Sequence, residues 1–133
     1  MCENYPRSMD NDVKEKARIL VADDVEAVTT LLVTALETAG YDVEVATDGE
    51  RAFELGNSGE FDLAIIDQLM PGRLGTEILR GWQEDGIEMP VIMLSGVEDD
   101  DVVVGSLESG AIDYVHKPFR LPELMARVKK HLG

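Results

Sequence analysis

The sequence predicts an α/β fold in which one parallel sheet is covered by helices on both faces. Short apolar segments alternate five times with longer segments, most of which carry apolar residues at helical spacing. Strict alternation of strands and helices favours right-handed crossovers, and these give parallel strands that are buried on both sides. With 133 residues, the chain is long enough for one domain with a proper hydrophobic core.

The first half of this alternation supplies three strands and two helices. The first and third strands are apolar runs that indicate burial, whereas the second alternates between apolar and polar residues. Glycines end both helices, and Gly40 is a good terminator for the first of them. The segments, in order, are a strand at 18–22, a helix at 26–40, a strand at 41–46, a helix at 48–59 and a strand at 61–67.

The second half supplies three helices and two strands. Its first helix presents Ile78, Leu79 and Trp82 on one face. Its second helix is weak, because three valines and Gly105 all lower helix propensity. The final helix is amphipathic and tolerates Pro122 in its first turn. The segments are a helix at 74–86, a strand at 89–96, a helix at 98–110, a strand at 111–116 and a helix at 121–133.

The chain is strongly acidic, with a formal net charge of −15. A field of this sign repels nucleic acids and anionic membrane surfaces, so we expect no direct nucleic-acid binding by this chain. The same field favours divalent cations. Solubility, or adaptation to high salt in a halophilic source, would explain the acidity equally well. The contents of hydrophobic residues, 44%, and charged residues, 29%, are ordinary for a soluble globular protein.

The start of the chain and its cysteine content indicate a cytoplasmic protein. Residues 1–16 are polar and without periodicity, which predicts a flexible leader ahead of a domain at residues 17–133. The single cysteine, Cys2, excludes an intrachain disulfide. No apolar run is long enough to span a membrane, and the start lacks the apolar segment of a signal peptide. We therefore expect a cytoplasmic location and no membrane association.

Polar residues follow four of the five predicted strands. In a doubly wound parallel sheet, the carboxyl ends of the strands meet at one edge, and ligands bind there. Three carboxylates, a hydroxyl and an ammonium group would converge at that edge. The residues are Asp23 and Asp24 after the first strand, Asp67 after the third, Ser95 and Gly96 after the fourth, and His116, Lys117 and Pro118 after the fifth.

Three neighbouring carboxylates require a cation, because otherwise their repulsion would force one of them to stay protonated. Mg²⁺ suits such a set, since it takes oxygen ligands and leaves room for a phosphoryl oxygen. A lysine, a serine hydroxyl and backbone amides would complete a site that stabilises a phosphoryl group in transfer. Asp67 is the best candidate for the acceptor, because it is the single acid at a central strand end.

Each of these signals also has an ordinary structural explanation. A pair of aspartates after a strand is more often a helix cap and a partner of the helix dipole. Met70, Pro71 and Gly72 form a turn by composition, Ser95 could be a turn residue, and Lys117 could be a salt-bridged loop residue. Their coincidence at four strand ends on one edge favours a shared site.

Four motifs resemble those of the receiver domain of two-component response regulators. They are ILVADD, LAIIDQLMPG, VIMLSG and GAIDYVHKPF, in that family's order and at compatible spacing, and the resemblance extends from residue 17 to about residue 133. It implies a flavodoxin-like, doubly wound five-stranded parallel sheet of order 2-1-3-4-5 flanked by five helices. It also implies a phosphoacceptor that catalyses its own phosphorylation and dephosphorylation and is not an enzyme for a separate metabolite.

The resemblance assigns a metal site and an acceptor. It implies that Asp67 is the phosphoacceptor and a metal ligand, that Asp24 binds Mg²⁺ directly, and that Asp23 acts largely through water. The backbone carbonyl of Leu69 completes the protein ligands, and Mn²⁺ or Ca²⁺ can take the place of Mg²⁺ in crystals.

The resemblance also assigns phosphoryl-binding groups and a switch. Ser95 and Tyr114 are implied to be the switch pair, and the bond between Lys117 and Pro118 is expected to be cis, since cis bonds occur almost only before proline. The implied phosphoryl-binding groups are the side chains of Lys117 and Ser95 and the backbone amides of Gln68, Leu69 and Gly96.

Two positions depart from the family in a way that affects dephosphorylation. Leu69, two residues after the acceptor, and Val97, two residues after Ser95, are both apolar. In the family these positions tune the attack of water on the aspartyl phosphate. Neither side chain can orient a water, so we expect slow self-dephosphorylation.

The resemblance implies a histidine kinase or a histidine phosphotransfer protein as phosphodonor. The implied output face consists of the helix at 98–110, the strand at 111–116 and the helix at 121–133, and a homodimer through this face is a further expectation. The output itself is not readable from the sequence. The chain could be a stand-alone receiver or part of a longer DNA-binding regulator or hybrid kinase.

Three other classes of protein compete with this interpretation. A dehalogenase-type phosphatase requires a second acid where Leu69 stands. A flavin-binding protein of the same architecture requires serine, threonine and glycine after the first strand, where DDVEAV would repel a phosphate. The third class is a pseudo-receiver, which binds partners without being phosphorylated. All the acceptor residues are present, so only an experiment can exclude it.

Overall fold

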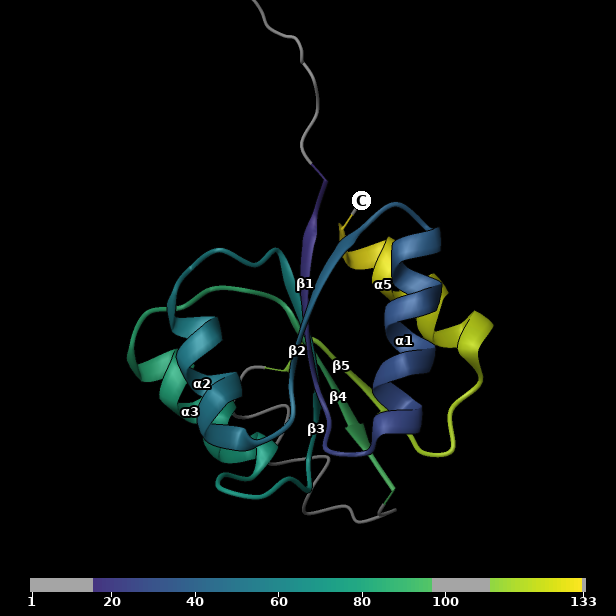
Figure 1. The fold of residues 1–133 in the computed structure, drawn as a ribbon. Helices are drawn as coiled ribbons and strands as arrows, with labels where there is room; N and C mark the ends of the chain where they lie inside the picture. Colours follow the sequence, from purple (N-terminus) through teal and green to yellow (C-terminus); the bar gives the residue numbers. More distant parts are fainter. Residues whose placement is uncertain (1–15, 97–110, 133) are drawn as a thin grey trace, which may run out of the picture.

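Five strands form one parallel sheet in the computed structural model, which describes residues 16–96 and 111–132 (Figure 1). The order of the strands is β2-β1-β3-β4-β5, which confirms the predicted order. The strands are β1 (Arg18–Ala22), β2 (Asp42–Ala46), β3 (Leu63–Asp67), β4 (Val91–Ser95) and β5 (Asp113–His116).

The register of the strands brings their carboxyl ends to one edge. Ala22 at the end of β1 pairs with Ile66 of β3, and Asp67 pairs with Leu94 of β4. Ser95 in turn pairs with His116 of β5. The residues that directly follow β1 and β5 therefore lie at the same edge of the sheet as the last residues of β3 and β4.

Helices cover both faces of the sheet, as the alternation predicts. Figure 1 shows α1 and α5 on one face and α2 and α3 on the other. The expected helix at 98–110 and residues 1–15 of the expected leader lie outside the described residues, so those expectations and the division at residue 17 stay predictions. The described helices are α1 (Glu26–Thr38), α2 (Gly49–Asn57), α3 (Gly75–Glu84) and α5 (Leu121–Leu132).

The core consists of two apolar clusters, one on each side of the sheet. All five residues of β3 are buried, because the strand is covered on both faces. Ile65 belongs to the cluster that includes Leu36 and Leu124, beneath α1 and α5. Ile66 belongs to the cluster that includes Ala52 and Trp82, beneath α2 and α3. Asp67 thus stands at the end of a strand that is buried along its whole length.

Two glycines allow α2 and α3 to approach each other closely. A Cβ atom at Gly56 would lie 2.1 Å from the Trp82 ring, and one at Gly81 would lie 2.5 Å from the Phe53 ring. Trp82 also donates a hydrogen bond from Nε1 to the carbonyl oxygen of Phe53, at 3.1 Å. The aromatic side chains therefore occupy the space that a side chain on either glycine would need.

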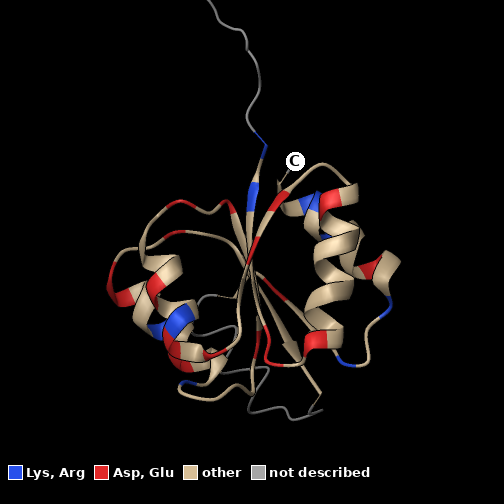
Figure 2. Cartoon of the chain, viewed as in Figure 1, with Lys and Arg blue, Asp and Glu red and all other residues tan. Residues whose placement is uncertain are grey.

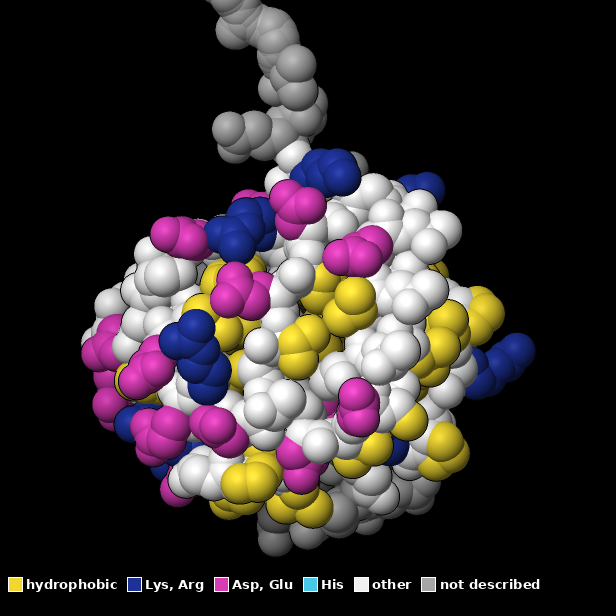
Figure 3. All heavy atoms as spheres, viewed as in Figure 1, with side chains coloured by type: hydrophobic (Ala, Val, Ile, Leu, Met, Phe, Trp, Pro, Cys, Tyr) yellow, Lys and Arg dark blue, Asp and Glu magenta, His cyan; other side chains and the backbone are white. Residues whose placement is uncertain are grey.

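Acidic side chains lie on the helices and at the ends of strands. Figure 2 shows Asp and Glu on α1, α2 and α3 and along the sheet, and Figure 3 shows them spread over the visible face with lysines and arginines between them. Among the described residues, no helix has the length and apolar character needed to cross a membrane.

Candidate functional site

Three carboxylates meet at the carboxyl edge of the sheet. Asp23 and Asp24 directly follow β1, and Asp67 is the last residue of β3. One carboxylate oxygen from each lies within 4.8 Å of the others. Asp23 is fully buried and Asp67 is 5% exposed, whereas Asp24 is exposed to solvent. The sequence prediction that these three acids converge is thus consistent with the structure.

Lys117 supplies positive charge to this cluster. Its Nζ donates a hydrogen bond to Asp23 Oδ2 at 2.8 Å and lies 3.4 Å from Asp67 Oδ2. Burial by itself lowers the pKa of Lys117, but the hydrogen bond to Asp23 and the attraction of both carboxylates outweigh it and raise the pKa. Lys117 therefore stays charged between the two buried acids.

A single lysine does not balance the three acids. Burial raises the pKa of Asp67, and repulsion from Asp23 raises it further. The nearby charge of Lys117 lowers the pKa without cancelling these effects. The site therefore favours the addition of positive charge next to Asp67, either as a proton or as a cation.

Asp23 also binds the backbone just before α1. Its Oδ1 accepts a hydrogen bond from the backbone N–H of Val25, at 2.9 Å, while its Oδ2 accepts from Lys117. The helix-cap explanation of the Asp23–Asp24 pair is not supported, because Val25 is the N-cap residue of α1 and no side chain caps the helix. Asp24 is exposed to solvent beside the cluster.

Ser95 lies beside Lys117 at the end of β4. The backbone N–H of Lys117 donates to the Ser95 carbonyl oxygen at 2.7 Å, and Ser95 is 1% exposed. Gly96 follows at the surface, and a Cβ atom there would lie 3.8 Å from Lys117 Cβ. The peptide bond between Lys117 and Pro118 is cis, which is the configuration that the resemblance implied.

The segment after Asp67 contains two of the three expected amide donors, those of Gln68 and Leu69, and the first of them is already paired. The Gln68 N–H donates to the Leu94 carbonyl oxygen at 2.9 Å and extends the contact between β3 and β4. Leu69 follows with its side chain 57% exposed. Because the Gln68 amide is engaged with β4, a proposal for phosphoryl binding rests on the amides of Leu69 and Gly96.

Tyr114, the expected switch aromatic, is half-buried on β5. It packs against the cluster beneath α2 and α3, and its ring makes an edge contact with His116, with centroids 4.9 Å apart and an interplanar angle of 78°. His116 follows Tyr114 by two residues on the same strand. Because side chains alternate between the two faces of a strand, both belong to the same face of β5.

Two groups of polar contacts were not foreseen from the sequence. The side chain of Gln68 is hydrogen-bonded to Thr76, and Asp113 accepts from Arg127 and pairs with His131. The Gln68–Thr76 contact does leave a signal in the sequence: Leu74, at the start of the predicted third helix, has no side-chain oxygen to cap that helix. The contacts of Asp113 join β5 to α5, and the periodicity of each segment does not reveal contacts between two segments.

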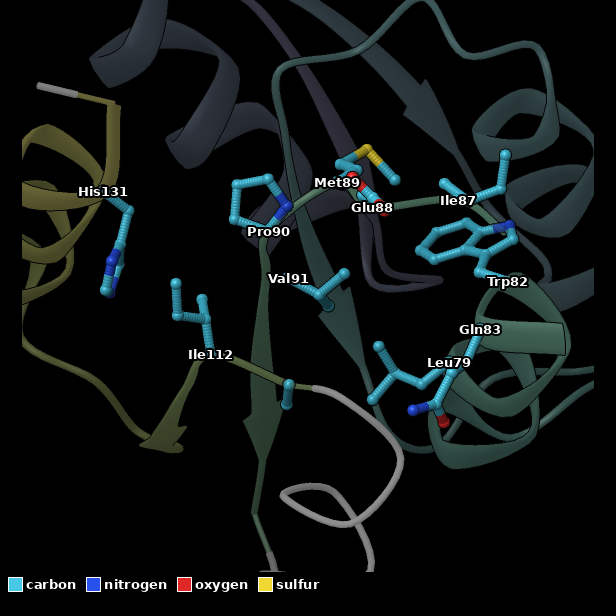
Figure 4. A pocket seen from close by; sticks show the side chains of 11 residues that line it. Leu79, Trp82, Gln83, Ile87, Glu88, Met89, Pro90, Val91, Ile112 and His131 are labelled. Carbon is cyan, nitrogen blue, oxygen red and sulfur yellow. The ribbon is translucent and has the colours of Figure 1, made fainter. Parts of the chain in front are cut away.

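One cavity lies away from the carboxylates. About 600 Å³ in volume, it lies between the end of α3, the start of β4 and β5, and the end of α5 (Figure 4). Trp82, Val91 and Ile112 line it together with Glu88 and His131. The charged edge of the sheet that forms the candidate site is therefore separate from this cavity.

The fold and this edge define a class of protein. Residues 19–129 match the family model of the response regulator receiver domain. Because the match spans most of the chain, the chain belongs to the receiver domains of two-component signalling. Receiver domains are signalling phosphoacceptors that take phosphoryl groups from histidine kinases, and they are generally not classical enzymes.

Two relatives are transcriptional regulators of Bacillus subtilis. The chain is 39% identical over 112 residues to the alkaline phosphatase synthesis transcriptional regulatory protein PhoP, covering 84% of this chain and 47% of that protein. It is 35% identical over 118 residues to the uncharacterized transcriptional regulatory protein YkoG, covering 89% and 52%. The chain thus spans about half the length of the curated relatives it matches.

Solved structures of receiver domains have the same fold. The receiver domain of the Francisella response regulator 1452 matches with a TM-score of 0.83 and 35% identity over 88% of this chain and 97% of that one. A CheY-like receiver domain protein from Methanospirillum hungatei matches with a TM-score of 0.84 and 31% identity over 89% and 94%.

Proposed function

We propose that this receiver domain accepts a phosphoryl group on Asp67, in a reaction that depends on Mg²⁺, and that the resulting change alters its binding to a partner. The observation that supports the proposal most strongly is the cluster itself: three carboxylates within 4.8 Å, with Lys117 bridging Asp23 and Asp67. The phosphodonor is a histidine kinase or a histidine phosphotransfer protein.

Four oxygen donors of this chain fit a hard divalent cation. They are the carboxylates of Asp23, Asp24 and Asp67 and the backbone carbonyl of Leu69, with Asp23 acting largely through water. The fit rests on the chemistry of the set, because it holds more negative charge than Lys117 balances and burial raises the pKa of Asp67. When bound, Mg²⁺ would neutralise charge on the phosphoryl oxygens.

The transfer exchanges one bond to phosphorus for another. A carboxylate oxygen of Asp67 forms a bond to phosphorus while the bond between phosphorus and the donor's imidazole nitrogen breaks, and the imidazole leaves and takes up a proton. Lys117, the Ser95 hydroxyl and the amides of Leu69 and Gly96 stabilise the phosphoryl oxygens. Ser95 lies at the end of β4 and Lys117 directly follows β5, so the fold already brings both to this edge.

The phosphorylated state is proposed to pull Ser95 toward the phosphoryl group while Tyr114 turns inward. Tyr114 is half-buried on β5, where such a movement would alter the surface of β5 and α5. The third part of the expected output face, at residues 98–110, lies outside the described residues. By analogy with relatives named as transcriptional regulators, the output is a partner or domain that acts on transcription.

The apolar side chain of Leu69 supports slow loss of the phosphoryl group. It follows the acceptor by two residues and is 57% exposed, so it lies where a polar side chain could hold an attacking water. Val97, the other apolar position, lies outside the described residues. An adduct that decays as fast as that of a chemotaxis regulator would contradict this part of the proposal.

Intact-mass measurement tests the proposal directly. The protein is incubated with Mg²⁺ and acetyl phosphate, beside a Mg²⁺-free sample, the Asp67→Asn variant and the Asp42→Asn variant, which changes an exposed acid of β2. One added phosphate is expected in wild type and in Asp42→Asn, and none in the other two samples. If wild type bound neither phosphate nor beryllofluoride with Mg²⁺, the chain would be a pseudo-receiver.

A further inference from the structure

Gln68, the residue after the proposed acceptor, uses all four of its hydrogen-bonding groups within the fold. Its backbone N–H donates to the Leu94 carbonyl oxygen and its carbonyl oxygen accepts from the Gly75 N–H, both at 2.9 Å. Its side-chain Oε1 accepts from the Thr76 N–H at 2.9 Å, and Nε2 donates to Thr76 Oγ1 at 3.3 Å. One side chain, 6% exposed, thus joins β3 to the first turn of α3.

The first turn of α3 lacks a cap of its own. The residue at the N-cap position is Leu74, which has no side-chain oxygen, whereas Asp48 at the start of α2 accepts from the Arg51 N–H at 2.8 Å. Glu77 accepts from the Leu74 N–H at 2.9 Å, which is one half of a capping box. The acceptor for the Thr76 N–H comes instead from Gln68, on the far side of the loop.

The hydrogen bonds of Gln68 close the loop at residues 69–74. At the end nearest the site, α3 begins so close to the acceptor that a Cβ atom at Gly75 would lie 2.9 Å from the Asp67 carbonyl oxygen. At its far side, the loop is held by the Gly49 N–H, which donates to the Pro71 carbonyl oxygen at 2.8 Å. Leu69 lies between these two attachments.

The side chain of Leu69 gives its backbone little support, because it is 57% exposed. The position of the Leu69 carbonyl and amide therefore depends on the backbone hydrogen bonds on either side. Gln68 makes the bonds on the side of Asp67, two through its backbone and two through its buried side chain, and together they leave residue 68 little freedom.

We propose that Gln68 is a positioning residue that caps α3 from across the loop and thereby holds the Leu69 backbone at the cation-binding edge. This role rests on the proposed function, since Leu69 is there a ligand of Mg²⁺ through its carbonyl. Groups that orient metal ligands from behind typically account for about tenfold to a hundredfold in metal affinity.

The test compares Gln68→Met with Gln83→Met. Methionine keeps the length of the side chain and removes both of its hydrogen bonds, and Gln83, the second glutamine of the chain, is exposed on α3. In Gln68→Met, hydrogen exchange of the Thr76 amide is expected to accelerate about tenfold, which is the size of a lost helix cap. The affinity for Mg²⁺, measured by calorimetry, is expected to fall about tenfold. Gln83→Met should change neither.

A second substitution separates positioning from capping alone. Leu74→Asp places an acceptor at the N-cap of α3, so adding it to Gln68→Met should restore the slow hydrogen exchange of the Thr76 amide. It should leave the affinity for Mg²⁺ low, because the new cap does not connect α3 to residue 68. Recovery of both properties would overturn the positioning role.

The outcomes distinguish this inference from the proposed function. Unchanged exchange at Thr76 in Gln68→Met overturns the cap whether or not Mg²⁺ binds. If wild type does not bind Mg²⁺, the proposed function and the positioning role both fail, while the exchange data still decide the cap. Should Gln68→Met not fold, Gln68→Asn keeps the amide but is one methylene too short to reach Thr76, and the same measurements apply.

Discussion

At the scale of single residues, Asp67 is in a position that favours function over stability. Its carboxylate is buried at the end of β3 beside the buried carboxylate of Asp23. Burial raises its pKa above the ordinary value of 3.8, so the folded protein holds the Asp67 proton more tightly than the unfolded chain does. Stability contributed by this residue is therefore lost as the pH rises from about that value through the raised pKa.

Removing the charge of Asp67 is accordingly expected to stabilise the protein when no divalent cation is present. Asp67→Asn should raise the free energy of unfolding at neutral pH by roughly 1 kcal/mol, the size of a typical point-mutation effect, because it removes a buried charge that lies beside Asp23. Asp23 remains available as the hydrogen-bond partner of Lys117. Thermal unfolding in EDTA, between pH 4 and pH 8, measures the effect, which should grow with pH.

Asp42→Asn is the matched control, because it removes an exposed acid from the same negatively charged molecule. Addition of Mg²⁺ should stabilise wild type and Asp42→Asn more than Asp67→Asn. Equal stabilisation of all three proteins by Mg²⁺ would contradict a role of Asp67 in cation binding. Equal stability of the two variants without Mg²⁺ would show that the burial of Asp67 carries no penalty.

At the scale of secondary-structure elements, the pairing of α2 with α3 depends on two glycines. Gly56 faces Trp82, whose side chain is 2% exposed and is held by its hydrogen bond to the Phe53 carbonyl. Gly81 faces the ring of Phe53, which is only partly buried and can move. The two positions should therefore differ in their tolerance of an added methyl group.

Gly56→Ala is expected to lower the free energy of unfolding by about 2–3 kcal/mol, because the new Cβ atom would lie 2.1 Å from a ring that cannot shift. Gly81→Ala should cost less. Chemical denaturation monitored by Trp82 fluorescence measures both, with Glu54→Ala, at an exposed site of α2, as the control. If Gly81→Ala lowered the free energy of unfolding more than Gly56→Ala, then Phe53, and not Trp82, would be the more rigid of the two rings.

The contact between β5 and α5 is polar as well as apolar. Arg127 and His131 of α5 both contact the carboxylate of Asp113, and Arg127 also donates to Glu123 at 2.9 Å. Burial by itself raises the pKa of Asp113, but the hydrogen bonds from Arg127 and His131 outweigh it and lower the pKa. This contribution to stability is therefore present above the ordinary pKa and is lost as the pH falls through the lowered one.

At the scale of the whole molecule, negative charge is spread over the surface. The 27 acidic residues outnumber the 12 lysines and arginines, so only some acids can form exposed pairs such as those of Arg18 with Glu44 and Glu60. Such exposed pairs contribute little individually. Self-repulsion between the unpaired acids therefore opposes the compact state at low ionic strength.

Salt is expected to stabilise this protein. Raising KCl from about 0.01 M to 1 M shortens the screening length from about 30 Å to about 3 Å. The resulting loss of repulsion should increase the free energy of unfolding by on the order of 1 kcal/mol, and the melting temperature by several degrees. Differential scanning calorimetry in KCl and EDTA measures this change apart from divalent-cation binding. A falling melting temperature would mean that screened ion pairs outweigh repulsion.

The sequence by itself determined the elements and the edge at which the site lies. Apolar periodicity and glycine or proline boundaries are local signals, so they located all five strands and the helices at α1, α2, α3 and α5. Because parallel strands present their carboxyl ends to one edge, the convergence of Asp23, Asp24, Asp67 and Lys117 followed from their places after strands. The order of the strands was inferred from the resemblance to receiver domains.

The tertiary structure decided which groups are buried and what each polar group contacts. The position of Lys117 between Asp23 and Asp67, the engagement of the Gln68 amide with β4 and the cap that Gln68 gives to α3 depend on distances between segments far apart in the chain. Periodicity reports which face of an element is apolar, but a hydrogen bond depends on the placement of two elements to within a few tenths of an ångström. Only the packed fold fixes that placement.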